Sequence, residues 1–480
     1  MENRKLGNLI RGILLVTMAG VASAATPWFG IRAVDSETGR GIPLIEFRTV
    51  NDIRCVTDNA GWIAFQEPGL MEREVWFSVS GPGYEMPKDG FGFTGVRLTP
   101  KAGETTTVQL SRTNIAERLG RLTGQGIYRD SELLGLPHPL PNLNPAGIMG
   151  QDSVNATPYR GKLFWLWGDT NVPQYPLGNY RTTCATTPLD ADPERGLAYE
   201  YFVDPEKPSQ PRKMMPMEAP GAVWLFGLLT VPDETGKDVL LAHYGRHLGL
   251  KPPEEHGIAR FNEARGVFES VLTLDKEETW RFPQGSATRE GDWFYFAHPF
   301  LHTRVRATLQ DVLTPTSYEA LRFDGKSWRW QRALPPTKQA DEAKRPESSR
   351  YQLTEADTGQ PVQIHGASIQ WNAWRKRWVM IGVQQGDKGA PSFLGEVWYA
   401  ESDAPDGPWR KAVKVVSHPR YSFYNPVHHP FFNAEGGRVI YFEGTYTLEF
   451  SGNPLAPARY DYNQLMYRLD LADPRLELVR

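Results

Sequence analysis

One strand-like pattern recurs five times from Gly147 onward. Each copy is a short apolar run that follows a turn rich in Gly, Asp, Lys or Arg and leads to a polar tip. The five copies are Phe164–Asp169, Val239–Tyr244, Phe294–Pro299, Val379–Gln384 and Val439–Gly444. Their starts lie 55 to 85 residues apart, which fits four-stranded units that carry loops. Five such units predict a five-bladed β-propeller, with a β-sandwich or an irregular barrel as the alternative.

The residues before these repeats predict a separate small β-sandwich at 27–112. Strand-like runs alternate there with the turn signals Asp35–Gly39, Asp58–Gly61 and Gly81–Tyr84. We expect residues 113–146 to be a connector with one short helix near 116–122, and the propeller to span 147–480. The chain has 15 Trp, 19 Tyr and 22 Phe beside 45 Gly and 39 Pro, which is typical of short strands and tight turns. The predicted fold class is therefore all-β, an N-terminal β-sandwich followed by a five-bladed β-propeller.

The N-terminus has the three parts of a secretory signal peptide, at residues 1–24. Arg4, Lys5 and Arg11 are basic, residues 13–21 are apolar, and residues 22–24 are small. The apolar run is too short to cross a bilayer as a helix, which needs roughly 20 residues. The alternative is a buried first helix. We expect cleavage and a periplasmic or extracellular location.

Charge and cysteine content exclude several partners and cofactors. The formal net charge is −3, and the signal peptide carries a net +2, which leaves −5 after its removal. This mild acidity argues against nucleic acid or an anionic membrane surface as partner. Two cysteines, Cys55 and Cys184, are too few for a Cys-rich zinc site, although they could pair in an oxidising compartment. No phosphate-binding loop or nucleophile elbow is present, so no cofactor is expected.

Two aspartates flank the first recurring hairpin. If Arg160-Gly161 is a two-residue turn, Asp152 and Asp169 are direct cross-strand partners with Cβ atoms about 4.5–5.5 Å apart. Like charges so placed destabilise a sheet, which indicates a functional need. At a propeller channel such a pair can split into an acid and an ionised carboxylate, as glycoside hydrolysis requires. The alternative is structural, with Asp152 capping a strand entrance and Asp169 binding turn amides.

Further polar residues occupy strand tips and strand entrances in the other blades. We predict that they converge on one funnel and bind a polyhydroxylated ligand, although each alone is also consistent with a buried or capping role. They are His243, Arg246, His298, His365, His428, His429 and Glu443. Three histidines near an axis could hold a metal, but no short His-x-His or His-x-x-x-His spacing favours one, and no metal is predicted. Glu396 is a reserve acid or an ordinary exposed strand residue.

Short motifs suggest two family resemblances. The order Val-Asp-x-x-Thr-Gly-x-x-Ile-Pro (34–43), Thr-Asp-x-x-Gly (57–61) and Gly-Tyr (83–84) resembles the carboxypeptidase-regulatory or transthyretin-like sandwich, which is usually an accessory module. The propeller, with Asp and Ser ahead of Trp-Gly-Asp-Thr (167–170), resembles the arabinanase, xylosidase and sucrase group. It is more similar to the endo-D-arabinanase family, glycoside hydrolase family 183. That resemblance implies catalysis by Asp152 and Asp169.

The chain departs from the arabinanase and sucrase pattern in two later blades. That group carries a carboxylate at the entrances of the second and third blades, where this chain has Val223-Trp224 and Gly285-Ser286. Either the first-blade pair suffices, or the chemistry has changed or been lost. The leading hypothesis is a secreted glycoside hydrolase acting on a poly- or oligosaccharide. The alternatives are a polysaccharide lyase, with a His and a Tyr abstracting a proton and Arg246 neutralising a uronate, or a non-catalytic sugar-binding propeller.

Overall fold

The chain is almost entirely β-structured. The computed structural model describes residues 27–140, 146–180, 182–249, 251–274, 276–283, 285–297, 300–332, 334–336, 350–386, 393–457 and 461–479. The only α-helices of these residues are α1 (Arg129–Leu133) and α2 (Leu309–Val312). Within the same ranges no helix has the length and apolar character needed to span a membrane. The predicted signal peptide lies outside the described residues.

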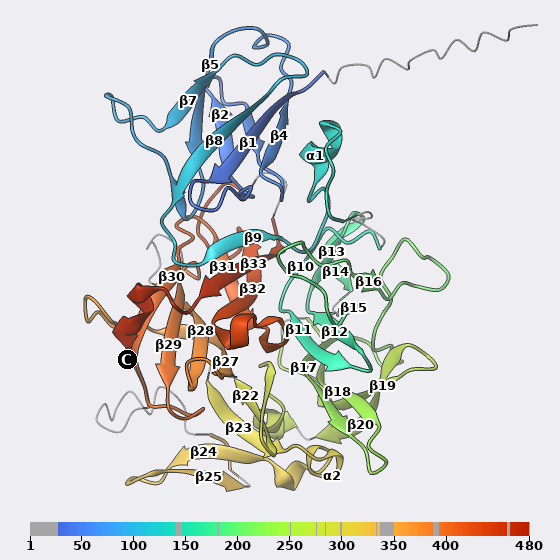
Figure 1. The fold of residues 1–480 in the computed structure, drawn as a ribbon. Coiled ribbons are helices and arrows are strands. Elements are labelled where there is room, and N and C mark those ends of the chain that lie inside the picture. The colour runs from blue at the N-terminus through green and yellow to red at the C-terminus, as the bar shows by residue number, and fades with distance from the viewer. Residues whose placement is uncertain are drawn as a thin grey trace, which may run out of the picture.

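The N-terminal domain is a sandwich of two four-stranded sheets, as predicted. One sheet has the order β4 (Trp62–Phe65), β1 (Phe29–Asp35), β8 (Thr105–Arg112), β6 (Tyr84–Glu85). The other has the order β3 (Arg54–Val56), β2 (Glu46–Thr49), β5 (Val75–Ser80), β7 (Gly95–Leu98). Alternate residues of the strands fill the space between the sheets, with Ile31, Phe47 and Phe77 fully buried. Figure 1 shows this domain, in blue, at one end of the molecule.

Five further sheets form the blades of the propeller. The first contains β11 (Asn155–Tyr159), β12 (Lys162–Trp167), β15 (Thr183–Pro188) and β16 (Glu200–Tyr201). The second contains β17 (Ala222–Pro232), β18 (Asp238–His247), β19 (Glu255–Asn262) and β20 (Val267–Leu274). The third contains β21 (Ala287–Glu290), β22 (Trp293–Ala297), β23 (Leu301–Arg306), β24 (Glu319–Phe323) and β25 (Trp328–Arg332).

The last two blades complete the ring. The fourth contains β27 (Ile364–Asn372), β28 (Arg377–Gln384), β29 (Val397–Ser402) and β30 (Trp409–Val416), with β26 (Tyr351–Glu355) parallel to β30. The fifth contains β31 (Ser422–His428), β32 (Val439–Thr447), β33 (Asn463–Asp470) and β9 (Glu117–Arg121). A small extra sheet, β10 (Gly150–Gln151), β13 (Thr170–Val172) and β14 (Tyr175–Tyr180), extends the first blade.

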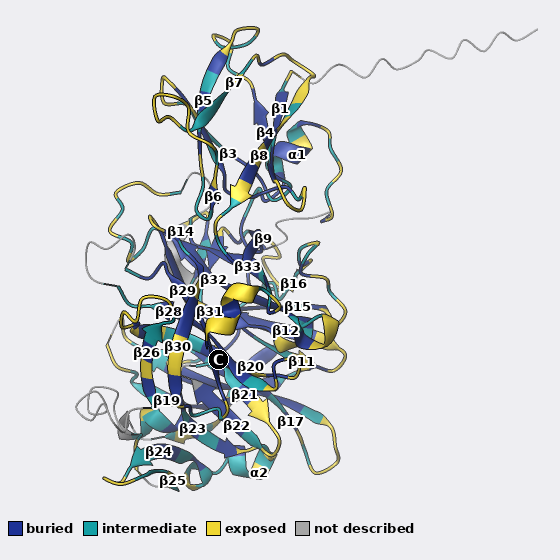
Figure 2. Cartoon of the chain, turned by 60° about the vertical axis from the view of Figure 1, so that its left-hand side comes forward, coloured by how far each residue is buried: buried dark blue, intermediate teal, exposed yellow. Residues whose placement is uncertain are grey.

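The sequence repeats correspond to equivalent strands of these sheets. The described parts of the five recurring segments lie on or directly beyond β12, β18, β22, β28 and β32, the second strand of every blade. The first strands contact one another in chain order, β11 with β17, β17 with β21, β21 with β27 and β27 with β31. The predicted five-bladed propeller is therefore confirmed. Figure 2 shows the blade strands mostly buried and their connecting turns exposed.

The ring is closed by a strand from the predicted connector. Residues 117–121, where a short helix was expected, form β9, which pairs antiparallel with β33. The helix prediction is wrong because the partner of this segment is not local: Leu465 lies opposite Arg121. In Figure 1, β9 runs between the sandwich and the strands of the fifth blade.

The sandwich is fixed to this closing strand. Arg118 of β9 is buried, donates to the carbonyl oxygens of Pro43 (2.8 Å) and Pro82 (3.0 Å), and packs over the ring of Tyr84. These partners all belong to the sandwich, so one guanidinium connects the two domains.

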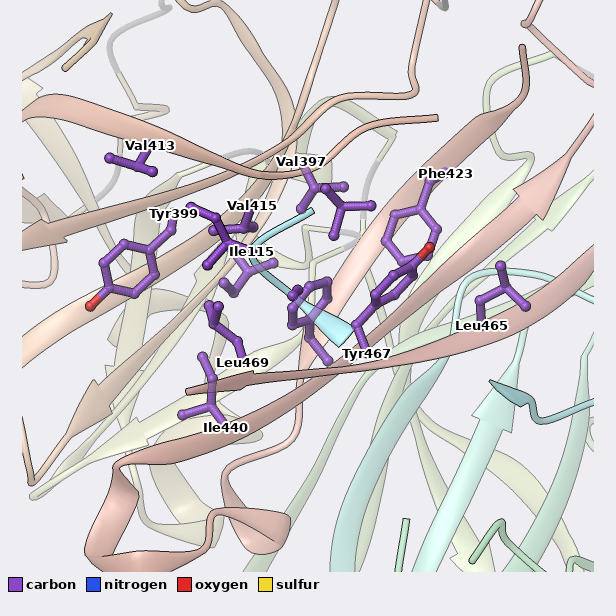
Figure 3. Packing of buried hydrophobic residues seen from close by; sticks show 14 of the residues in the cluster. Ile115, Val397, Tyr399, Val413, Val415, Phe423, Ile440, Leu465, Tyr467 and Leu469 are labelled. Atoms are coloured by element: carbon purple, nitrogen blue, oxygen red, sulfur yellow. The ribbon is translucent and has the colours of Figure 1, made fainter. Parts of the chain in front are cut away.

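The interface between the fourth and fifth blades is the largest apolar region near this junction. Figure 3 shows Val397, Tyr399 and Val415 of the fourth blade facing Phe423 and Tyr467 of the fifth. Ile115, from the segment that precedes β9, packs into the same cluster. Closure is thus supported by side-chain burial as well as by strand pairing.

The two cysteines lie in different domains, on β3 and on β15. Both positions are described, and no disulfide joins Cys55 to Cys184. Cys184 is fully buried in the first blade, and burial raises the pKa of its thiol well above the usual value.

Candidate functional site

The first-blade hairpin places two aspartates opposite each other. Arg160 and Gly161 form the two-residue turn, with φ of 48° and 75°, as a type I′ hairpin requires. The pairing of β11 with β12 and the pairing of β10 with β13 follow the same register. The predicted register, in which Asp152 is opposite Asp169, is therefore confirmed. Asp152 and Asp169 lie in the gap between the two pairings, where the Asp152 N–H donates to the Asp169 carbonyl (3.1 Å). We call this end of the channel the aspartate mouth.

Asp152 is held by donors from three directions. Its Oδ1 accepts from the Asp169 amide (2.8 Å), its Oδ2 accepts from the Tyr424 hydroxyl (2.9 Å), and Tyr462 is a further hydrogen-bond partner. Desolvation and the negative charge of Asp169 outweigh these donors and raise the pKa of Asp152 to about 6. A carboxyl group with this pKa can hold a proton under mildly acidic conditions and release it near neutrality.

Asp169 is oriented by the second blade. The Trp224 indole N–H donates to Asp169 Oδ1 (2.8 Å). Trp224 belongs to the Val223-Trp224 pair at the entrance of the second blade, where the arabinanase and sucrase pattern carries a carboxylate. The second blade therefore contributes to the mouth through a hydrogen-bond donor, which fixes one oxygen of the first-blade pair.

A third carboxyl group, that of Glu449, was not predicted from the sequence. Glu449 follows the end of β32 by two residues, as Asp169 follows the end of β12 by two. Burial, followed by the negative charges of Asp461 and Asp169, raises the pKa of Glu449. The equivalent position in the first blade could have predicted Glu449 as a site residue. However, β32 extends to Thr447, three residues beyond the recurring segment, so Glu449 lies outside that segment.

Backbone strain is concentrated around Asp152. Ser153, Asn425 and Tyr462 all have positive φ, of 52°, 49° and 58°, although none is glycine. The Asn425 amide donates to the Ser153 hydroxyl (2.8 Å), and the Ser153 N–H donates to the Thr445 hydroxyl (3.2 Å). These bonds join the fifth blade to the first at the aspartate mouth. Such conformations persist where the surroundings enforce them and are frequent at functional sites.

Gly168 leaves space for the Asp152 carboxylate. A Cβ at this position would lie 2.4 Å from Asp152 Oδ1 and 3.2 Å from Ser153 Cβ. We therefore expect Gly168→Ala to displace the carboxylate and to lower turnover about 10²-fold, measured as kcat on the substrate that the screen below identifies. Gly69→Ala, where a Cβ meets nothing within 4 Å, is the control. Equal turnover of both variants would contradict a catalytic position for Asp152.

Two of the predicted ligand-binding residues, both on the second blade, are held in internal contacts. His243 is buried among Phe226, Phe282 and Phe296, and burial lowers its pKa to about 3. Arg246 donates to the Pro220 carbonyl (2.7 Å) and lies beside Glu255. The structure thus places His243 between the second and third blades and Arg246 in internal contacts of the second blade.

The other described members of the set lie on the fourth and fifth blades. His428 and His429 are buried and border a cavity at the opposite end of the channel, next to residues 155–158. His429 contacts the fully buried Glu443 (2.7 Å). His365 is exposed on β27, and His298 lies outside the described residues. Glu396 accepts from Ser417 (2.7 Å) and pairs with Lys414 (3.1 Å).

The described ranges contain no group of three or more His, Cys, Asp or Glu arranged to hold a metal. The carboxyl groups at the aspartate mouth can transfer protons and act as nucleophiles.

Comparisons with known proteins find structural likeness only. No family model and no curated protein matches this chain. Similar solved structures include an exo-1,5-α-L-arabinanase from a bovine ruminal metagenomic library, at 11% identity and TM-score 0.35 over 68% of this chain and 95% of that one. A thermostable family-43 glycoside hydrolase has 9% identity and TM-score 0.32 over 68% and 91%. The Cellvibrio cellulosa α-L-arabinanase has 8% sequence identity and a TM-score of 0.35, over 67% of this chain and 92% of that one. At these values we interpret the site from its own geometry.

Proposed function

We propose that this protein is an exported glycoside hydrolase that cleaves a polysaccharide at the aspartate mouth. The observation that carries the proposal is the pair of opposed carboxyl groups, Asp152 and Asp169, of which Asp152 has a pKa raised to about 6. Glycoside hydrolysis needs one carboxyl group that donates a proton and one that stays ionised. Desolvation and the charge of its neighbour give Asp152 the first property.

In the proposed mechanism, protonated Asp152 donates its proton to the oxygen of the scissile glycosidic bond. Asp169, held by the Trp224 indole, acts on the anomeric carbon as the nucleophile or by activating water. Tyr424 and Tyr462 stabilise the carboxylate of Asp152 after the proton has left. Glu449 is a second candidate for the proton donor, since its pKa is also raised.

The positions of His428 and His429 do not favour the lyase alternative. His428 and His429 are buried at the opposite end of the channel, away from the aspartate pair. Export remains part of the proposal and depends on the predicted signal peptide, and a periplasmic or extracellular location follows from it. The similarity of the first-blade motif to endo-D-arabinanases makes arabinan the first polysaccharide to test.

A product screen tests the proposal. The mature protein is incubated with arabinans, other neutral polysaccharides and uronate-containing polysaccharides, beside Asp169→Asn as the matched inactive variant. We expect new reducing ends without ultraviolet absorbance from unsaturated sugars, and no products from Asp169→Asn. Unsaturated products would favour a lyase. Binding without any product would favour a sugar-binding propeller.

A further inference from the structure

A second cavity lies on the same side of the propeller as the aspartate pair. It sits between the second and third blades and has a volume of about 500 Å³. Its walls come from the first half of β17, the ends of β18 and β22, the starts of β19 and β23, and the 3₁₀ helix at Lys276–Arg281. We call it the interblade pocket. A cavity of this size is within the range of small-molecule sites.

Strand register connects the interblade pocket to the aspartate pair. Trp224, Gly245 and His256 are successive cross-strand partners on β17, β18 and β19, so their Cβ positions share one face of the second blade. Trp224 donates to Asp169 and packs against His247 (ring centroids 4.7 Å apart), and His247 lines the pocket. One indole and one imidazole therefore separate the pocket from the carboxylate of Asp169.

Gly245 lines the pocket beside His247. It is the cross-strand partner of both Trp224 and His256, and it lines the cavity. A Cβ at this position would lie 2.8 Å from His247 Nε2. The absence of a side chain therefore lets the His247 imidazole lie close to the sheet at the wall of the pocket.

His256 contributes unused hydrogen-bonding capacity. Its side chain lines the pocket and is 3% exposed, yet neither Nδ1 nor Nε2 has a hydrogen-bond partner among the described residues. Burial lowers the pKa of His256, so near neutral pH the ring is uncharged, with one N–H donor and one acceptor nitrogen. Buried polar atoms are normally paired, and a hydroxyl group can satisfy either nitrogen.

The remaining walls are aromatic and uncharged. Trp280, Phe296 and Phe300 line the pocket together with prolines and threonines, and the described lining residues include no Asp, Glu, Lys or Arg. Phe300 stacks on Tyr351 (3.8 Å between ring centroids), and Trp280 lies against Arg281 (4.5 Å). These contacts fix the two rings from outside the pocket. Flat apolar walls beside a few polar atoms suit a sugar ring, which has apolar C–H faces and hydroxyls at its edge.

We propose that the interblade pocket is a subsite that binds an uncharged sugar ring of the polysaccharide, next to the ring held at the aspartate pair. The proposal deepens the proposed hydrolase function and rests on it. His256 is the residue that recognises a hydroxyl of this ring, and Trp280 is the stacking platform. Because the described part of the wall contains no Lys or Arg, a uronate ring is disfavoured at this position.

The experiment measures binding separately from hydrolysis. Calorimetry on the full chain carrying Asp152→Asn uses short arabinan, xylan and galactan oligosaccharides, their monosaccharides, and oligogalacturonate as the charged counterpart. Onto this background we add His256→Leu, Trp280→Ala and, as the matched control, Trp371→Ala, which removes a partly exposed Trp of β27 outside the pocket. Thermal unfolding of each variant verifies folding.

We expect one neutral oligosaccharide series to bind, and His256→Leu and Trp280→Ala each to weaken it about tenfold or more. Trp371→Ala should leave oligosaccharide binding unchanged. None of the substitutions should change the binding of monosaccharides. Unchanged oligosaccharide binding in both folded pocket variants would overturn the subsite, even if the wild-type protein hydrolyses polysaccharide. Equal binding of oligogalacturonate would overturn its preference for uncharged sugars. Binding that depends on His256 in a protein whose wild type releases no reducing ends would support the subsite and reject the hydrolase.

Discussion

The Asp152→Asn variant is expected to lose about 10²–10⁴-fold in kcat, the contribution typical of a positioned acid or base. The asparagine amide is not acidic enough to protonate a leaving group. In the wild-type protein, activity that needs protonated Asp152 should fall as the pH rises through about 6. The measurement is kcat against pH on the polysaccharide identified by the screen. The variant should lose this alkaline limb together with its turnover.

Stability provides the control for this substitution. The folded state raises the pKa of Asp152 from 3.8 to about 6, so it holds the proton more tightly than the unfolded chain does. The wild-type protein therefore loses stability as the pH rises between these two values. Asparagine carries no charge and avoids this loss, so at neutral pH the variant should unfold at the same temperature as the wild type or higher. An inactive variant that is also less stable would instead indicate a structural role.

Substrates with different leaving groups distinguish the two candidate proton donors. A substrate with a good leaving group needs little protonation, so loss of the true donor should spare it while abolishing polysaccharide cleavage. If Glu449→Gln shows this pattern and Asp152→Asn loses both activities, the proton comes from Glu449. Asp152 would then serve the other carboxylate role.

Leu119→Ala in β9 is expected to lower the free energy of opening of the fifth blade by about 2–5 kcal/mol, as for other buried leucines. Leu119 is buried in the cluster shared by the first and fifth blades, beside Trp165 and Met466. The measurement is hydrogen exchange of the β33 amides, which should exchange faster in the variant because their outer partner strand is held less tightly.

A substitution of similar size in the sandwich provides the comparison. Ile31 is fully buried between the two sheets of the N-terminal domain, and Ile31→Ala should increase exchange in β1 and β8 more than in β33. Normal protection of β33 in Leu119→Ala would show that β9 is not needed to hold the ring together.

The propeller could be predicted from sequence because its signals are local. Each second strand is a short apolar run after a turn, and the Arg160-Gly161 turn alone determines the register that brings Asp152 to Asp169. The closing strand could not be predicted in this way. Glu117–Arg121 has two arginines within five residues, and its strand conformation depends on pairing with β33 at the other end of the chain.

The directions of the side chains around the channel could not be predicted from the sequence either. The pairing of β31 with β32 shifts between Tyr424 and Val427, and such a shift changes which face each following residue occupies. Tyr424 thus contacts Asp152, while His428 and His429 are buried farther along the same segment. Equivalent positions along the strands did not mean equivalent positions in the funnel.

The closing strand also affects the order in which the molecule can be completed. β9 is synthesised before any blade, yet the hydrogen bond from the Gln464 N–H to the Thr123 hydroxyl, just after this strand, spans 341 residues. Until β33 is available, β9 is an unpaired strand edge, which is prone to join the wrong partner. Its Arg118 is bound by carbonyl groups of the sandwich, a domain that is complete by then. The N-terminal domain can therefore act as an internal folding template that presents β9 to the last blade.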